Sequence, residues 1–396
     1  MKKVTIKGHA MRSIAGSAGI LGFWMVAPES LRVVGQASGY GWQALLFMML
    51  FLVLVLSSVI SRRAIQNQST PRFLQIMTLV GALATTLYGT TGMLVTAGFT
   101  FNEVFYYRFP NFGFAFLVLF GVVVVQLLTE RTRMYFQTMS VGLVILVILV
   151  ITILGFMQLE TSSYSELPVA TNSFMGLLPL IYIYLSLDEN PAITEPETEV
   201  KTVIGVITGI AILLSCWMIV SFYTVGPDRL FASSIPYMNT AKSVLGQSGR
   251  LLMGGAVIIG VAGAVCGLFT LSRTKIQLIY PASLIRYRFM IPLILALIIS
   301  VMLMVGVAGS QFIETYIETS ILFWLISSAI VLIYQSIKDS LLFVRFVGLT
   351  SGLAYLTSSY ILFTRIDEYK PGLILIGVLG SCAIIATLLT RRYQTS

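Results

Sequence analysis

Charge is scarce in this sequence, at 10% of residues, whereas a typical soluble domain carries about 25%. Hydrophobic residues make up 57% of the chain, and the mean hydropathy is +0.91. Polar connections are also short, the longest lying at 159–170, 188–201 and 225–249. We therefore expect an integral membrane protein that forms one transmembrane domain and has no extramembrane enzyme module.

Histidine and cysteine are nearly absent as well. The only histidine, His9, lies in the polar N-terminal tail, and Cys216, Cys266 and Cys382 are far apart within apolar segments. These residues offer neither a disulfide framework nor a metal site built from Cys or His, and no Ser/His hydrolase site can be assembled. We expect no cofactor and no enzyme activity.

Apolar runs long enough to cross a bilayer follow one another along the chain. When the spans alternate, most Lys and Arg residues fall on the side of the N-terminus, which predicts cytoplasmic termini in a plasma or inner membrane. The net charge of +9 is thus a topology signal, with a contact to anionic lipids left open, and does not indicate nucleic-acid binding. Twelve candidate spans are predicted, at about 12–31, 40–61, 73–98, 111–128, 134–158, 171–187, 202–224, 250–272, 289–308, 314–336, 340–363 and 372–390.

Three glycines occupy the middle of the first span. A glycine in a helix interior is about 1 kcal/mol less favourable than alanine, so three of them need a reason. They could let two helices pack closely, or they could mark a helix opened toward a ligand. The stretch reads Gly16-Ser17-Ala18-Gly19-Ile20-Leu21-Gly22-Phe23-Trp24, and Pro28 follows it.

The sixth segment is interrupted too, by Gly176 and Pro179. Proline removes a helix hydrogen bond and clashes with the preceding turn. Segments one and six are five spans apart and oppositely oriented, which is typical of transporters built from inverted repeats, whose broken helices bind substrate near the midplane. This pairing favours the second interpretation of the glycines, in which free backbone N–H and carbonyl groups meet a substrate.

Four short motifs resemble the amino acid–polyamine–organocation superfamily of transporters. They are the glycine-rich first span with its connector Gly35–Trp42, the run Ser173-Phe174-Met175-Gly176, the pair Asn190-Pro191, and Ser272-Arg273. The resemblance implies an all-α, LeuT-like fold with a five-plus-five inverted repeat and discontinuous helices one and six. In the single domain 1–396, repeat one would cover about 12–158, repeat two about 171–336, and peripheral helices about 340–390.

The resemblance also implies a substrate site and an ion site. Two departures from the family pattern leave the coupling ion, H⁺ or Na⁺, unassigned: Leu177 and Leu178 follow Gly176 where many members have an acidic residue, and the fifth span has no lysine. Cys266 and Thr270 only partly match the paired hydroxyls of sodium-coupled relatives. Substrate-binding residues would be Gly16, Ser17, Ala18, Gly19, Ile20, Gly22, Trp24, Tyr88, Phe174, Gly176, Pro179, Tyr182 and Trp324.

We therefore expect a transporter or exchanger of amino acids or related amines that works by alternating access. A neutral amino acid is favoured because no fixed charge lies at the motif positions. The alternative is a non-transporting amino-acid sensor or accessory subunit on the same fold. An embedded enzyme is less favoured because Glu314 and Glu318 lie near the predicted outer surface. As protein partners, a second copy of the chain and an accessory subunit both stay open.

Overall fold

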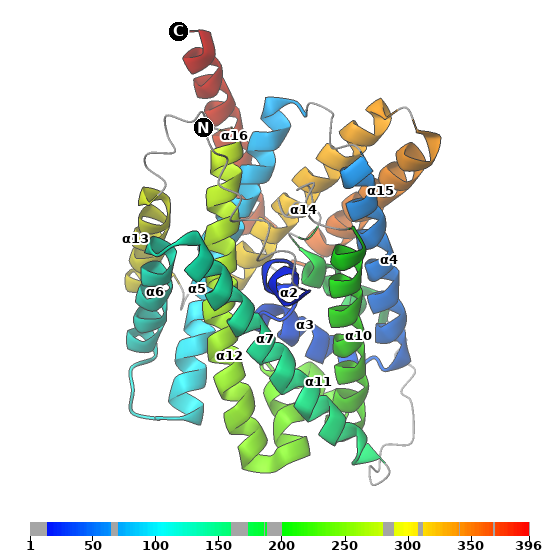
Figure 1. Ribbon diagram of the computed structural model, residues 1–396, viewed down its shortest axis with the longest axis vertical. Coiled ribbons are helices and arrows are strands. Elements are labelled where there is room, and N and C mark those ends of the chain that lie inside the picture. Colours follow the sequence, from blue (N-terminus) through cyan, green and yellow to red (C-terminus); the bar gives the residue numbers. More distant parts are fainter. Residues whose placement is uncertain are drawn as a thin grey trace. The chain divides into compact units, whose positions relative to one another are not determined.

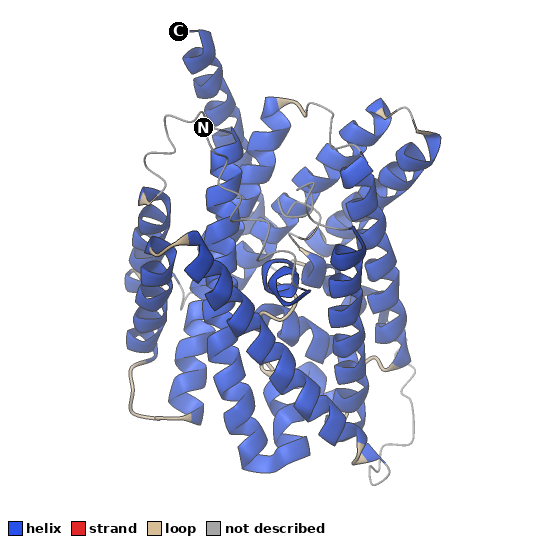
Figure 2. Cartoon of the chain, viewed as in Figure 1, coloured by secondary structure: helices blue, strands red, loops and turns tan. Residues whose placement is uncertain are grey.

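The computed structural model describes residues 14–64, 70–159, 173–185, 187, 200–279, 289–307, 312–339, 341–366 and 369–395. These residues form helices joined by short loops, and none of them lies in a strand (Figure 2). The all-α prediction is therefore confirmed for the described part of the chain. In chain order the elements are α2 (Ile14–Gly22), α3 (Pro28–Ser38), α4 (Trp42–Ala64), α5 (Arg72–Val104), α6 (Asn111–Leu127), α7 (Glu130–Phe156), α8 (Ser173–Leu177), the 3₁₀ helix η2 (Leu178–Tyr184), α10 (Val200–Val225), α11 (Pro227–Ala232), α12 (Pro236–Ile279), α13 (Met290–Met304), α14 (Ile313–Lys338), α15 (Leu342–Phe363) and α16 (Tyr369–Thr395).

Eight of these helices are long and apolar enough to cross a membrane, namely α4, α5, α7, α10, α12, α14, α15 and α16. Shorter apolar helices lie at Asn111–Leu127, Met175–Tyr184 and Met290–Met304. The chain is thus a polytopic membrane protein, as its composition predicts. The count of twelve spans stays a prediction, because the first and sixth segments are each divided between two short helices.

Local sequence sets several helix boundaries. The side chain of Thr129 accepts a hydrogen bond from the backbone N–H of Thr132, which caps the start of α7. Gly226 has a φ of 84°, a conformation that glycine adopts without penalty, and it turns the chain from α10 into α11. Gly246 has a φ of 61° and kinks α12 ahead of its apolar stretch.

The helices group into two compact units, which we describe separately. Unit 1 comprises Met1–Val53, Met93–Leu187 and Glu195–Gly267, and unit 2 comprises Leu54–Gly92, Asp188–Thr194 and Leu268–Ser396. Helices α4, α5 and α12 each contribute one part to each unit.

Unit 1 is organised around the short helix α2. This helix packs against α7 and α10, which lie beside it in Figure 1. Helix α3 packs against α10, α11 and η2. The two interrupted segments of the sequence are therefore central elements of one unit.

Unit 2 is built around α14, which packs against α15 and α16. Small residues allow the close approach of α15, since a methyl group added at Gly352 would lie 2.5 Å from Cγ1 of Ile333. Ala84, Phe323, Leu375 and Leu379 form a buried apolar cluster in this unit. In the same unit, Arg62 Nη2 donates hydrogen bonds to the carbonyl and hydroxyl oxygens of Ser328, at 2.9 and 2.6 Å.

Candidate binding site at two interrupted segments

The first span is interrupted just after its glycines. Helix α2 ends at Gly22, residues 23–27 form turns and a bend, and α3 begins at Pro28. Ala27 has extended backbone angles, φ −63° and ψ 151°, as expected before a proline at the first position of a helix. The Trp24 carbonyl accepts hydrogen bonds from the Ala27 N–H (3.1 Å) and the Ser30 hydroxyl (2.6 Å). The interruption is therefore an ordered turn held by local hydrogen bonds.

The second interruption replaces most of the sixth span with a 3₁₀ helix. One turn of α-helix, α8, leads into η2, and Pro179 lies in its first turn. The chain leaves helical geometry at Leu185, with φ −54° and ψ 144°. A 3₁₀ run of seven residues is long for this geometry, whose hydrogen bonds are poorer than those of an α-helix. The segment is thus held mainly by packing, consistent with its buried side chains.

These two interruptions meet inside unit 1. Trp24 Nε1 donates a hydrogen bond of 2.7 Å to the carbonyl oxygen of Tyr182. The same carbonyl accepts the Leu185 N–H at 3.1 Å. Trp24 is 1% exposed and Tyr182 8% exposed, so the contact lies away from solvent. Two segments predicted to be broken at corresponding positions are therefore joined by a buried hydrogen bond.

The glycines of α2 lie against neighbouring helices. A methyl group added at Gly19 would come within 2.5 Å of the Thr138 Cα atom on α7, and one at Gly22 would collide with Ile210 on α10. Gln137 Nε2 donates to the Gly19 carbonyl at 3.1 Å. Close packing, the interpretation set aside in favour of a backbone site, accounts for both glycines. The turn that could face a ligand lies further along, at residues 23–27.

Gly176 also lies against an aromatic ring. A methyl group there would collide with the hydroxyl and ring of Tyr40, whose ring packs edge-on against Phe231 at a centroid distance of 4.7 Å. Only glycine fits at this position with the Tyr40 ring in place. The Tyr184 hydroxyl donates to the Met48 carbonyl at 3.1 Å, which attaches the end of η2 to α4.

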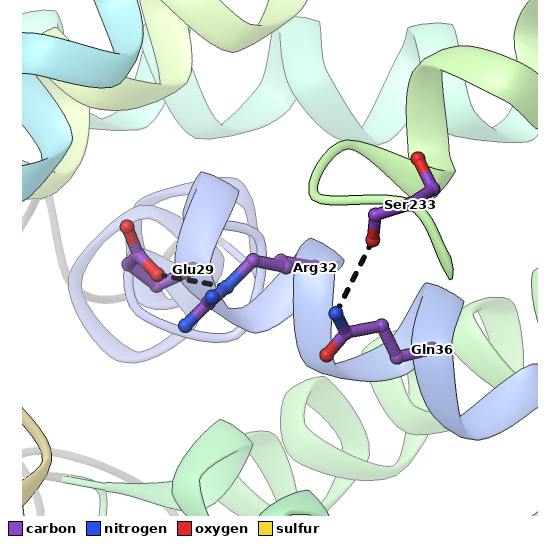
Figure 3. Close-up of polar contacts among 4 residues, drawn as sticks. All are labelled: Glu29, Arg32, Gln36 and Ser233. Atoms are coloured by element: carbon purple, nitrogen blue, oxygen red, sulfur yellow. Dashed lines mark hydrogen bonds and ion pairs between the residues drawn. The ribbon is translucent and has the colours of Figure 1, made fainter. Parts of the chain in front are cut away.

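Polar contacts along α3 hold this helix in place (Figure 3). The Arg32 Nε atom lies 3.4 Å from a Glu29 carboxylate oxygen, one turn apart on α3. Gln36 Nε2 donates to the Ser233 carbonyl at 3.2 Å, and the Ser233 hydroxyl accepts from Asn239 Nδ2 at 3.0 Å. These bonds connect α3 to the segment between α11 and α12, so the chain following the first interruption is fixed at its far end.

Three of the predicted site residues lie in unit 2. The Tyr88 ring packs 5.4 Å from the Tyr316 ring, beside the apolar cluster of that unit. The Lys275 ammonium lies 5.4 Å from the Trp324 ring centroid, a cation–π geometry. The Thr270 carbonyl accepts the Thr274 hydroxyl at 2.9 Å.

Several other predicted site residues lie on α2, α8 and α12 in unit 1. Cys266 is in unit 1, where Gln126 Nε2 donates to its carbonyl at 2.8 Å and approaches its sulfur at 3.3 Å. Gly16 and Ser17 lie in α2 and Phe174 in α8, but their side chains are outside the described part of the structure. Ala18 and Ile20 are partly buried on α2. The Asn190-Pro191 motif falls outside the described residues.

Sequence reasoning missed several residues that contact the predicted site residues, and four of them bring polar groups to the site or to its packing. They share one signal, a polar side chain within or next to an apolar span. Many residues of the chain have this signal, so it does not single out these four. They are Tyr40, Gln126, Gln137 and Lys275.

The surroundings of the junction are apolar and aromatic. Phe23, Trp24, Met25 and Leu180 are at most 2% exposed. Among the described residues, no group of three or more His, Cys, Asp or Glu side chains could hold a metal ion. Hard divalent cations are held by carboxylate, carbonyl and water oxygens, so the lack of clustered carboxylates among these residues disfavours such a site.

Comparisons with solved structures define the fold. The manganese transporter of Eremococcus coleocola, in a variant form, superposes with a TM-score of 0.61 at 11% identity, covering 96% of this chain and 93% of that one. The same transporter in complex with an aromatic bis-isothiourea-substituted compound gives a TM-score of 0.57 at 12% identity, covering 98% and 95%. No protein-family model and no curated protein matches the sequence. The likeness shows a shared fold over nearly the whole chain.

These comparisons correct the family assignment. The resemblance to the amino acid–polyamine–organocation superfamily is contradicted, and with it the expectation of an amino acid permease with a LeuT-like fold, because the structural matches are manganese transporters. The motifs behind the resemblance are short patterns of Gly, Ser and Pro. Any membrane helix that must be interrupted or closely packed favours the same residues, so the patterns indicate local geometry and do not identify a family.

Proposed function

We propose that this protein is a membrane transporter that carries a small solute past the junction of its two interrupted segments. The hydrogen bond between Trp24 and Tyr182 carries the proposal, because it places two irregular, buried stretches from distant parts of the sequence side by side. Irregular backbone at membrane depth is tolerated where it is buried in protein or lines a cavity, and transporters use it to bind solutes. The shared fold with a manganese transporter supports the same class of function.

The solute we propose is small, organic and without a formal negative charge. The junction offers indole and phenol rings together with main-chain carbonyls. A divalent cation is disfavoured by the lack of clustered carboxylates among the described residues. Trp24 and Tyr182 would line the path, while Gly19, Gly22 and Gly176 would set the approach of the helices around it.

Several finer expectations remain predictions under this proposal. They are the twelve spans, the internal repeat of 12–158 and 171–336, cytoplasmic termini and the coupling ion. An accessible-cysteine scan of the N- and C-terminal tails in intact cells would test the orientation.

Uptake into proteoliposomes tests the function. We expect saturable uptake of at least one solute from a panel of uncharged organic solutes, organic amines and Mn²⁺, with the active solute organic. Uptake no greater than in protein-free liposomes, together with solute-induced thermal stabilisation, would favour the sensor alternative. Saturable uptake of Mn²⁺ alone would contradict the proposed solute chemistry but not transport itself.

A further inference from the structure

We propose that unit 2 contains a binding site for a phosphate-type oxyanion, centred on Arg273 of α12. Arg273 is 8% exposed, and its Nη1 atom is buried and has no hydrogen-bond partner. A guanidinium stays charged at any physiological pH and presents donors arranged to bind two oxygens of one anion. The inference does not depend on which solute the protein transports.

A buried, uncompensated charge is costly, so the position of Arg273 needs a stabilising partner. Arginines often extend their charged end toward water, but water does not reach the Nη1 donor here. Favourable interaction with the carboxyl end of a helix does not explain it either. Arg273 lies six residues before Ile279, the last residue of α12, and the helix-end effect is confined to about the last turn.

The surroundings of Arg273 along α12 are also basic. Two residues on, Lys275 is 8% exposed, with its ammonium over the Trp324 ring. Arg72 Nη2 donates to the carbonyl of Ile279 at 3.1 Å. These neighbours add positive charge at the same end of α12.

Few carboxylates lie in the described part of unit 2. There, acidic residues are confined to Glu314 and Glu318 in the first two turns of α14 and Asp339 directly after that helix. The described parts of α4, α5 and α12 that belong to this unit carry none. The buried Nη1 donor of Arg273 lacks a partner, and a phosphate group matches both the charge and the fork of donors of the guanidinium.

Two sources could supply this chemistry: the head group of an anionic lipid or free phosphate. Thermal unfolding of the full-length protein distinguishes them. One arm compares nanodiscs of phosphatidylcholine alone with nanodiscs that also contain phosphatidylglycerol. The other adds inorganic phosphate to detergent-solubilised protein. Stabilisation by phosphatidylglycerol alone indicates a lipid site, and stabilisation by phosphate indicates a site for the soluble anion.

Variants assign the effect to Arg273. Arg273→Gln removes the charge, Arg273→Lys keeps the charge without the fork, and Arg345→Gln is the matched control because Arg345 is exposed on α15. We expect Arg345→Gln to respond like the natural protein. Affinity for the effective probe should fall about tenfold or more in Arg273→Gln and by less in Arg273→Lys.

The proposal is overturned if neither probe stabilises the natural protein, or if Arg273→Gln responds to the probe as the natural protein does. If Arg273→Gln does not fold, Arg273→Lys decides the question. An unchanged response in that variant would show that no oxyanion is held by the guanidinium fork.

Discussion

The indole N–H of Trp24 and the main-chain carbonyl of Tyr182, which are 158 residues apart in the sequence, form a buried hydrogen bond of 2.7 Å. Each residue lies within an irregular stretch, Trp24 between α2 and α3 and Tyr182 in η2. A donor that is covered from water must find an acceptor, so this bond constrains the position of both stretches. It is the most specific link between the two halves of the candidate site.

Replacing Trp24 with Phe should lower stability by about 0.5–1.5 kcal/mol beyond the loss of ring volume, because the Tyr182 carbonyl loses one of its two donors and keeps the Leu185 N–H. The matched control is Trp217→Phe. Trp217 is also fully buried, but its Nε1 has no hydrogen-bond partner. Thermal unfolding in detergent should therefore show a larger fall in Tm for Trp24→Phe. Equal falls in the two variants would mean that the bond contributes nothing to stability.

Replacing Gly19 with Ala should destabilise the protein by about 1–3 kcal/mol, because the added methyl group would overpack the contact between α2 and α7. The backbone of Thr138, 2.5 Å from the position of that methyl group, cannot move away as a flexible side chain could. Gly205→Ala on α10 is the control, since nothing lies within 4 Å of its added methyl group. That variant should be neutral or stabilised by up to about 1 kcal/mol. A stable Gly19→Ala protein would count against close packing as the role of Gly19.

Gly176 and Tyr40 should be energetically coupled. Gly176→Ala alone should lower Tm, because its methyl group would collide with the Tyr40 ring. In the double variant Gly176→Ala with Tyr40→Ala, the collision is absent, so the combined loss should be smaller than the sum of the two single losses. A coupling of about 0.5–3 kcal/mol is typical of residues in direct contact. Additive losses would show that the two residues do not constrain each other.

Composition and periodic apolar runs were sufficient to predict a polytopic helical protein, because spans are defined by local hydrophobicity. The two interruptions were also predictable, since Gly and Pro mark them directly. The role of Gly19 could not be predicted. It depends on Thr138 and Gln137, which lie on a helix more than a hundred residues away in the sequence. A local sequence pattern contains no information about such a partner.

Lys275 illustrates the same limit. The span predicted at about 250–272 ends too early, because α12 continues to Ile279 and places Lys275 against Trp324. The two ends differ because a helix can extend beyond its apolar stretch when its polar residues find partners in the fold. The family resemblance failed for a related reason, since short motifs reflect helix interruption and packing in many membrane proteins.

The central claim is that solute passes the junction of the two interrupted segments. The most direct test is the rate of solute uptake into proteoliposomes containing equal amounts of folded natural protein, Trp24→Phe or Trp217→Phe, measured well below the Tm of each. We predict saturable uptake by the natural protein, a loss of about tenfold or more in Trp24→Phe, and a rate within about twofold of the natural one in Trp217→Phe. Equal uptake by the two variants, or no saturable uptake of any panel solute by the natural protein, would contradict the account.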